Sequence, residues 1–373
     1  MASFKLLCPK CGKEYSLKSK IWKCSCGNFL DILTVIEESV DYFERIKNRI
    51  HSMWRYWELL PIDKKYLISI GEGWTPIIAK DYRNITLYFK LDYLNPTGSF
   101  KDRGASALIS HLTSIGINEI VEDSSGNAGA AIAAYSAAAG IKCRIYVPEK
   151  APKAKILQIR SYGAEVVRVG GNREQVNKEA LKAAEKSFYA GHLWNPFFTE
   201  GLKTIVYESF EQIGGVDAVI IPVGSGGLAL SICKGFKDLL SMGAIEEMPR
   251  IYGVQAEGFT AVYQILHPNY KTRKPEKILA DGIAVPDPPR KHQIADEIKK
   301  TGGDIVVVNN EEIIRALNRL AKWGLFVEPT SATILSAFEK LRDKGILKPK
   351  EKVLMPLTGF GLKAADKLLN LIE

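Results

Sequence analysis

The feature of this 373-residue chain that most limits its fold is an alternation of short apolar strands with helices, which begins near Leu87. Runs such as ITLYFKL, CRIYVP and AVIIPV carry the β-branched and aromatic residues typical of buried strands. Strands that alternate with helices in this way form parallel sheets covered by helices. The sequence therefore predicts an α/β fold, with one set of strands before a loop at residues 190–203 and a second set after it. Residues 36–60 look helical and lead into the first set.

Composition and charge exclude several classes of protein. Lysine and arginine exceed aspartate and glutamate by nine, but the basic residues are scattered and form no dense block. That excess suits an anionic cofactor or substrate, and we expect no nucleic-acid partner. No apolar run approaches the roughly 20 residues that cross a membrane. The first residues, MASFKLLCPKCG, have no signal-peptide pattern, so we expect a cytoplasmic protein without a membrane partner.

Four of the six cysteines crowd into the first 26 residues: Cys8, Cys11, Cys24 and Cys26. In a reducing compartment such crowding favours a metal over disulfides. Four thiolates suit tetrahedral zinc, and a glycine follows each pair, as the turns of a zinc ribbon require. The second pair is spaced C-x-C rather than C-x-x-C, and free thiols are the alternative. We expect a structural zinc ion, because four thiolates leave no open position.

A candidate catalytic lysine lies in NPTGSFKDRG, residues 95–104. Asn-Pro-Thr-Gly is a turn sequence, and a helix is predicted to start just after it. Lysine forms Schiff bases with carbonyl cofactors, and desolvation makes its amine nucleophilic near neutral pH. Lys101 is therefore a candidate cofactor anchor, although a lysine at a helix start is more often an ordinary solvated residue.

Two further segments place polar groups at predicted helix starts. In DSSGNAG, Ser124, Ser125 and the following backbone amides form a candidate nest for a carboxylate, and Asn127 offers an amide donor for a ring oxygen. The alternative is a polar turn with an asparagine cap. In PVGSGGL, residues 222–228, a predicted strand leads into a glycine turn whose backbone amides suit a phosphate. The alternative is a plain tight turn.

A fourth segment, PLTGFG, follows the last predicted strand. The hydroxyl of Thr358 is able to bond a neutral ring nitrogen. A carboxylate there would instead keep a pyridinium ring protonated and make the cofactor a stronger electron sink.

These four segments, in this order, resemble the fold type II pyridoxal-phosphate (PLP) enzymes, and the threonine synthase family most of all. KLDYLNPTGSFKDRGA looks like that family's Schiff-base lysine motif, and FVEPTSA and LTGFGLK look like its C-terminal signatures. The resemblance implies PLP on Lys101, Asn127 beside its phenolic oxygen and Thr358 at its ring nitrogen. Its phosphate would be bound by Gly224, Ser225, Gly226, Gly227 and Leu228.

The resemblance also implies a fold similar to the tryptophan synthase β subunit, with the cofactor between two α/β domains. We expect a zinc-ribbon segment at residues 1–35 and a small domain at residues 96–204. The large domain would comprise residues 36–95 and 205–373. Many archaeal and bacterial threonine synthases carry similar N-terminal cysteines.

The sequence departs from the family where a threonine synthase binds the substrate's own phosphate. The family pattern is similar to Asn-Ser-x-Asn-Pro-x-Arg ending in Gly-Gln-Lys-Thr, and the aligned stretch here is HLWNPFFTEGLKT. The matching residues are Asn195, Pro196, Gly201, Lys203 and Thr204. His192, Leu193, Phe198 and Leu202 stand where Asn, Ser, Arg and Gln are expected. Losing the arginine removes a bidentate phosphate ligand, and Lys203 and Arg173 are the candidate replacements.

The expected function is that of a PLP-dependent lyase that converts O-phosphohomoserine to threonine and phosphate. The candidate substrate-binding residues are Ser124, Ser125, Asn195, Lys203 and Thr204. GSGGL and LADGIAV look more like serine/threonine dehydratases, so an ammonia-lyase is one alternative. A β-replacement enzyme acting on O-phosphoserine, of the cysteate or cysteine synthase type, is another. A zinc-ribbon binding module on an inactive scaffold is the non-enzymatic alternative, and the intact cofactor segments argue against it. We expect a homodimer.

Overall fold

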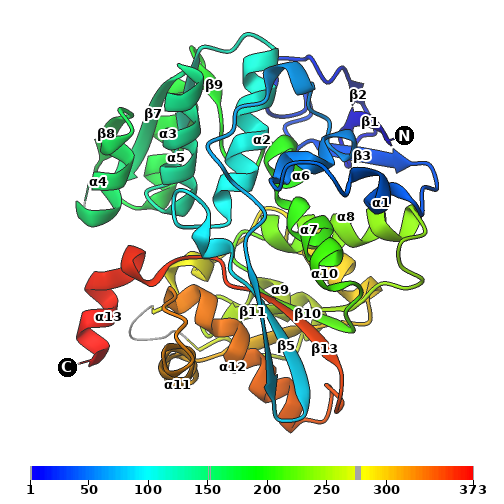
Figure 1. The fold of residues 1–373 in the computed structure, drawn as a ribbon. Coiled ribbons are helices and arrows are strands. Elements are labelled where there is room, and N and C mark those ends of the chain that lie inside the picture. Colours follow the sequence, from blue (N-terminus) through cyan, green and yellow to red (C-terminus); the bar gives the residue numbers. More distant parts are fainter. Residues whose placement is uncertain (1, 150, 152, 274–278, 373) are drawn as a thin grey trace. The chain divides into compact units, whose positions relative to one another are not determined.

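The computed structural model describes residues 2–149, 151, 153–273 and 279–372. These residues form two compact units. The first contains the chain up to Trp74, residues 95–205 and residues 241–244, and the second contains residues 75–94, 206–240 and the chain from Ile245 onward. The first unit is mostly blue to green in Figure 1, and the second runs from yellow-green to red with the cyan pair β4 and β5.

The first unit contains a three-stranded antiparallel sheet of order β2-β1-β3 and a four-stranded parallel sheet of order β8-β7-β6-β9. Its strands are β1 (Ala2–Leu7), β2 (Glu14–Tyr15), β3 (Asp31–Ile36), β6 (Glu119–Glu122), β7 (Lys142–Pro148), β8 (Glu165–Val169) and β9 (Phe188–Tyr189). Its helices are α1 (Tyr42–Ile46), α2 (Lys101–Ser114), α3 (Asn127–Ala139), α4 (Lys153–Ser161), α5 (Arg173–Ala183) and α6 (Pro196–Leu202), with 3-10 turns η1 (Met53–Leu59) and η2 (Lys64–Tyr66).

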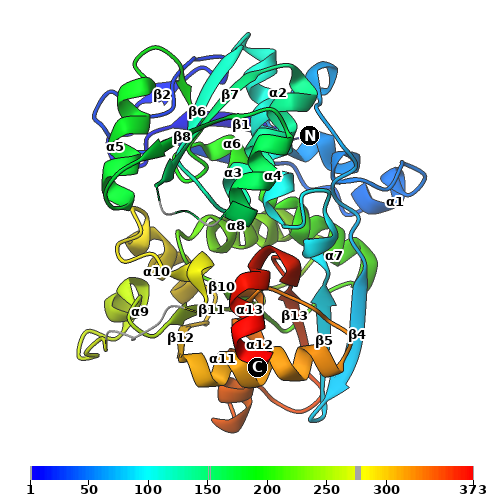
Figure 2. The same ribbon diagram turned by 90° about the vertical axis from the view of Figure 1, so that its left-hand side faces the viewer.

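Helices α3 and α5 cover opposite faces of the parallel sheet, whose strands lie side by side in Figure 2. Ile145 and Val147 of β7 belong to the core that also contains the buried alanines of α3. Tyr146, between them, packs instead in a cluster with Val176 and Ala180 of α5. Successive side chains of a strand point to opposite faces, so this alternation assigns one helix to each face. Parallel strands covered on both faces are the predicted arrangement.

The second unit is built on a six-stranded sheet of order β12-β11-β10-β13-β5-β4. Its strands are β4 (Ile77–Tyr82), β5 (Ile85–Lys90), β10 (Ala218–Pro222), β11 (Arg250–Ala256), β12 (Ile305–Val308) and β13 (Lys352–Pro356). Its helices are α7 (Thr204–Ile213), α8 (Gly227–Ser241), α9 (Ala261–Leu266), α10 (Lys291–Lys300), α11 (Asn310–Lys322), α12 (Pro329–Asp343) and α13 (Ala365–Ile372), with 3-10 turns η3 (Asp92–Leu94), η4 (Asp281–Ile283) and η5 (Gly361–Ala364).

Neighbours in this sheet come from distant parts of the chain. The parallel pair β5 and β13 joins strands more than 260 residues apart, seen as cyan beside red in Figure 1. All pairs are parallel except the edge pair β4 and β5, which is antiparallel. Buried side chains of the strands and of α12, such as Phe338, form one core, and this burial holds the sheet and helix together.

The strands and helices predicted from about Leu87 onward are confirmed. Three details differ. The predicted loop at residues 190–203 contains α6, because Pro196 occupies the first helical turn and the side chain of Asn195 caps it. Residues 36–60 begin with the last residue of β3 and then contain α1 and η1, rather than one long helical region. Residues 36–74 belong to the same unit as residues 95–205, unlike the expected grouping with the C-terminal domain, since Met53 and Trp54 are part of that unit's core.

Within the part of the chain that the structure describes, every helix is too short or too polar to span a membrane.

Candidate active site

Lys101 is the first residue of α2, and the residue after it fixes the preceding turn. The buried carboxylate of Asp102 accepts a hydrogen bond from the backbone N–H of Thr97 at 2.6 Å and another from the Thr97 hydroxyl. A carboxylate in the first turn of a helix is also stabilised by the helix dipole. The Asn-Pro-Thr-Gly turn and the start of α2 are therefore held together, and Lys101 projects from a fixed point.

The amine of Lys101 lies in apolar surroundings. Its Nζ is 4.6 Å from the ring centre of Phe100 and 5.7 Å from that of Phe198. Burial lowers the pKa of Lys101 to about 8, and although the Glu122 carboxylate opposes this change, the positive charge of Arg173 adds to it. At pH 7 roughly a tenth of such an amine is neutral, against about one part in three thousand for an ordinary lysine. Lys101 is thus chemically suited to attack a carbonyl carbon.

The loop between β6 and α3 contains Ser124 and Ser125, and Asn127 is the first residue of α3. All three residues are partly exposed. The Ser124 hydroxyl accepts a hydrogen bond from the Gly126 N–H at 3.3 Å. A Cβ atom at Gly129 would lie 1.9 Å from the Ser124 carbonyl oxygen, so the loop lies against the first turn of α3 only because Gly129 has no side chain. The loop therefore presents hydroxyl groups beside the unpaired N–H groups at a helix start, as a carboxylate nest requires.

Two acidic residues immediately before this loop, the buried Glu122 and the partly buried Asp123, belong to a hydrogen-bond network. Glu122 has no exposed surface, and one of its carboxyl oxygens lies 2.9 Å from Nδ1 of His192. The carboxylate of Asp123 accepts hydrogen bonds from the Tyr189 hydroxyl and from the Asn177 amide, both at 2.8 Å. Burial, with the neighbouring charge of Asp123, raises the pKa of Glu122 well above its usual value.

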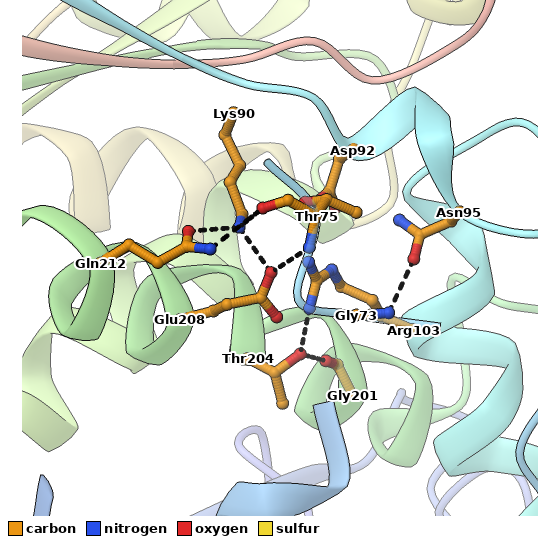
Figure 3. Close-up of polar contacts among 10 residues, drawn as sticks. All are labelled: Gly73, Thr75, Lys90, Asp92, Asn95, Arg103, Gly201, Thr204, Glu208 and Gln212. Carbon is orange, nitrogen blue, oxygen red and sulfur yellow. Dashed lines mark hydrogen bonds and ion pairs between the residues drawn. The ribbon is translucent and has the colours of Figure 1, made fainter. Parts of the chain in front are cut away.

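The predicted phosphate-binding residues of the first unit have partners within the protein. Asn195 caps α6 by accepting a hydrogen bond from the Phe197 N–H at 3.1 Å. The buried ammonium of Lys203 lies 2.7 Å from the Glu200 carboxylate and 3.4 Å from the Thr34 hydroxyl. Thr204 donates to the Gly201 carbonyl and accepts from Arg103, which Figure 3 shows as the lower dashed lines.

In the second unit, the glycine turn between β10 and α8 has no room for a side chain at Gly224 or Gly226. A Cβ atom at Gly224 would lie 2.6 Å from the Gly282 carbonyl oxygen, and one at Gly226 would lie 1.9 Å from the side chain of Ile294. Gly226 also has a φ of +91°, which favours glycine. The turn, Gly224 to Gly227 with Ser225 partly exposed, leads to Leu228 in the first turn of α8. A glycine turn that opens a helix is the kind of segment whose backbone amides are able to approach a phosphate.

Thr358 follows β13 and is positioned by Ser331 of α12. The Ser331 hydroxyl oxygen accepts hydrogen bonds from the N–H groups of Thr358 at 3.0 Å and Gly359 at 2.9 Å. The two hydroxyl oxygens of Ser331 and Thr358 are 2.9 Å apart. Thr358 thus sits at the carboxyl end of a parallel strand, where ligands of α/β sheets bind.

Comparisons with known proteins give the family. Residues 68–359 match the model of the pyridoxal-phosphate dependent enzymes. The chain belongs to this family. It is 36% identical over 98% of its length to the threonine synthase of Methanocaldococcus jannaschii, covering 94% of that protein. It is 32% identical over 99% of its length to the threonine synthase of Methanosarcina acetivorans, covering 95% of that one.

The fold agrees. A PLP-dependent aspartate racemase structure superposes with a TM-score of 0.67 at 26% identity, over 88% of this chain and 97% of that one. The predicted fold type II α/β class is therefore confirmed, and so is the resemblance to threonine synthases. The chain is a PLP-dependent lyase of the threonine synthase type.

The residues of this PLP enzyme fit its cofactor chemically. Lys101 supplies an amine whose pKa is lowered to about 8. The glycine turn supplies backbone donors that a side chain at Gly224 or Gly226 would displace. Thr358 supplies a hydroxyl group that Ser331 orients. These groups match, in kind, the carbonyl, phosphate and ring nitrogen of PLP.

A buried polar cluster in the second unit lies at the start of the lysine motif and was not predicted. The ammonium of Lys90 bonds the Thr75 carbonyl oxygen at 2.6 Å, the Gln212 side-chain oxygen at 2.8 Å and the Glu208 carboxylate. Figure 3 shows these contacts converging on one nitrogen. Lys90 and Glu208 have no exposed surface, so their ion pair joins β5 to α7 inside the unit.

The four N-terminal cysteines come together. Their sulfur atoms all lie within 4.8 Å of one another, and the pairs Cys8–Cys26 and Cys11–Cys24 are 3.6 Å apart. Four sulfurs around a tetrahedral zinc are about 3.8 Å apart, given a Zn–S distance of about 2.3 Å. The cluster therefore has the dimensions of a four-thiolate metal site.

Sequence reasoning did not assign Glu122, Asp123 or Tyr189 to the site, and it noted His192 only as a departure from the family. One signal was available: an acidic pair at the end of a buried strand, directly before the Ser124 loop, lies at the edge where parallel sheets bind ligands.

Proposed function

We propose that this enzyme converts O-phosphohomoserine and water to threonine and inorganic phosphate. The observation that carries the proposal is the similarity to threonine synthases, which extends over 98% of the chain at 36% identity. The lowered pKa of Lys101 supports it, because the reaction needs an amine that is able to exist in its neutral form near pH 7.

Each predicted cofactor contact becomes part of this proposal. Lys101 is the covalent anchor, and when released from the cofactor it takes the proton from the substrate Cα. Asn127 donates to the phenolic oxygen of the cofactor, and Thr358 donates to its unprotonated ring nitrogen. The cofactor phosphate is bound by Gly224, Ser225, Gly226, Gly227 and Leu228. PLP, when bound, supplies an electron sink for the charge left at Cα.

Ser124 and Ser125 bind the substrate carboxylate in this proposal. Their loop stands at the start of α3, where backbone N–H groups lack intrahelical partners. The predicted roles of Asn195, Lys203 and Thr204 in binding the substrate phosphate stay predictions, and each of these side chains already has a partner within the protein.

We also propose that Cys8, Cys11, Cys24 and Cys26 bind one structural zinc ion. The mutual distances of their sulfur atoms support it. Gly12 and Gly27 have φ values of +71° and +83°, as tight turns after each cysteine pair require. A cytoplasmic location and a homodimer remain predictions.

A second candidate function is a serine/threonine ammonia-lyase, which has no second phosphate to bind. Phe198 at the position of the family's arginine and the ion pair of Lys203 favour it. A β-replacement reaction on O-phosphoserine is the third.

Steady-state assays on one preparation of the holoenzyme distinguish these functions. Threonine synthase activity gives threonine and phosphate from O-phosphohomoserine in equal amounts. An ammonia-lyase gives a ketoacid from serine or threonine, and a β-replacement enzyme releases phosphate from O-phosphoserine only with a nucleophile such as sulfide or sulfite. Ketoacid formation without threonine formation would refute the proposal.

A further inference from the structure

The position of the missing arginine is filled by an apolar ring. Phe198 is 1% exposed, and its ring packs directly on Gly104 of α2, where a Cβ atom would lie 2.4 Å from it. The ring centre is 5.7 Å from the Lys101 amine and 5.6 Å from the His192 ring. Helix α6 therefore offers an apolar surface beside Lys101, where the related pattern carries a cation.

Lys203 does not fill this gap in the observed conformation. Its ammonium is buried, lies 2.7 Å from the Glu200 carboxylate and faces Thr34 and the ring of Phe4, which belong to the N-terminal sheet. An ammonium held by a buried carboxylate is already neutralised, and withdrawing it would leave Glu200 without its counter-charge.

Arg173 is a cation placed differently, at the first residue of α5. Its side chain is exposed, and among the described residues it has no hydrogen-bond or ion-pair partner. Asn177, one turn later on the same face of α5, donates to Asp123 at 2.8 Å. This contact ties that face of the helix to the carboxyl end of β6, where the Ser124 loop begins. Asp123 is next to Glu122, the partner of His192, so this face of α5 lies close to the His192 contact. In keeping with this, the charge of Arg173 lowers the pKa values of both Lys101 and His192.

His192 presents its second ring nitrogen away from Glu122. Nδ1 is 2.9 Å from the Glu122 carboxyl, whereas Nε2 has no hydrogen-bond partner among the described residues. Burial raises the pKa of Glu122 and lowers that of His192, and both shifts favour the uncharged form of the group. With Nδ1 in contact with the Glu122 carboxyl, Nε2 is the ring nitrogen left for a ligand, and it donates when it carries the ring hydrogen.

We propose that Arg173 and Nε2 of His192 bind the phosphate of the substrate, taking the place of the arginine that Phe198 has replaced. The proposal rests on the proposed function in that it assumes a phosphorylated substrate. It makes these two residues the specificity determinants for a phosphate monoester over a free hydroxy-amino acid. Arginine provides a charged, planar pair of donors, and the imidazole adds a neutral one.

The test uses the holoenzyme, whose bound cofactor already fills the cofactor phosphate site, and inorganic phosphate as the probe. The variants are Arg173→Gln, Arg173→Lys and His192→Ala. Lys178→Gln is the matched control, because Lys178 is also an exposed cation of α5 but lies on another face. Phosphate binding is measured by calorimetry at fixed ionic strength, and KM and kcat are measured with O-phosphohomoserine.

Arg173→Gln is expected to weaken phosphate binding and raise KM at least tenfold, since a charge-assisted contact is lost. Arg173→Lys restores part of the loss, and His192→Ala has a smaller effect, about threefold to tenfold, typical of one neutral hydrogen bond. Lys178→Gln leaves both constants within about twofold, as expected when only screened, distant charge is removed. Because Arg173 is exposed, the melting temperature of Arg173→Gln stays at the wild-type value.

Equal phosphate binding by the wild type, Arg173→Gln and Lys178→Gln would overturn the inference, and so would a wild-type holoenzyme that binds no phosphate. An inactive wild type on O-phosphohomoserine whose phosphate binding still depends on Arg173 would refute the proposed function and leave the inference standing. Normal turnover of O-phosphohomoserine by Arg173→Gln would refute the inference and leave the proposed function standing.

Discussion

The hydroxyl oxygens of Ser331 and Thr358 lie 2.9 Å apart, and this contact determines what Thr358 is able to donate. Ser331 accepts two backbone N–H groups, which occupy both lone pairs of its oxygen. Its own hydrogen must then go to Thr358 at 2.9 Å or to the Gly359 carbonyl at 3.3 Å, and the shorter contact favours Thr358. Thr358 therefore keeps its own hydrogen for another acceptor, such as an unprotonated ring nitrogen.

The first prediction concerns this pair. Ser331→Ala leaves two buried N–H groups without an acceptor, so the free energy of unfolding should fall by about 1–3 kcal/mol or more. Thr358→Val should retain the fold but shift the absorbance spectrum of the bound cofactor and lower kcat, whereas Thr358→Ser should retain both. Urea unfolding and visible spectra check this. A Thr358→Val enzyme with an unchanged spectrum and kcat would argue against a contact with the ring.

The second prediction is a pH dependence for Lys101. Only the neutral amine attacks the PLP aldehyde, and burial lowers the pKa of Lys101 to about 8. The rate at which the apoenzyme captures PLP should therefore rise about tenfold per pH unit up to pH 7, bend near pH 8 and level off above it. With an ordinary lysine, the capture rate would continue to rise up to about pH 10.5. Lys101→Ala should show neither the visible absorbance band nor turnover, and retained turnover would refute its role.

Much of the fold could be predicted because local pattern and burial agree. The apolar run of α3 is mostly buried and the β-branched run of β10 is fully buried, as their sequences require. The alternation of strands and helices was therefore enough to predict both elements. Strand β4 was missed, since it is an exposed antiparallel edge strand whose residues carry no buried pattern. The sequence pattern did not predict helix α6, because the helix is short and the Asn195-Pro196 pair at its start is equally typical of a turn.

Of the candidate site, motifs indicated residues whose chemistry is tied to a local turn, such as Lys101 and Gly226, and their roles stay predictions. Contacts between distant residues were not accessible. Nothing in the sequence near Lys203 indicates that its ammonium pairs with Glu200, and nothing near His192 identifies Glu122, 70 residues earlier, as its partner. Long-range pairs depend on how strands and helices pack, which periodicity alone does not specify.

The third prediction tests the buried ion pair of Figure 3. Lys90→Met leaves the Glu208 carboxylate buried without its counter-charge, which should cost about 3–5 kcal/mol of folding free energy. Glu208→Gln should also be destabilising, because it leaves the Lys90 ammonium buried without its counter-charge. The double variant Lys90→Met/Glu208→Leu removes both charges and should be more stable than either single variant. Denaturant unfolding of all four proteins checks this, and additive losses in the double variant would contradict a coupled pair.

The last prediction concerns the metal. Purified protein should contain one zinc ion per chain, because the four sulfur atoms already lie at distances that suit tetrahedral coordination. Cys24→Ser removes a ligand from the buried side of the cluster, so zinc content and the melting temperature should both fall. Cys143→Ser, in a different part of the same unit, is the matched control and should keep its zinc. Cobalt substitution should give the absorption of a tetrahedral thiolate complex. Less than about a tenth of a zinc ion per chain, with four thiols free to react, would contradict a site whose geometry alone predicts tight binding.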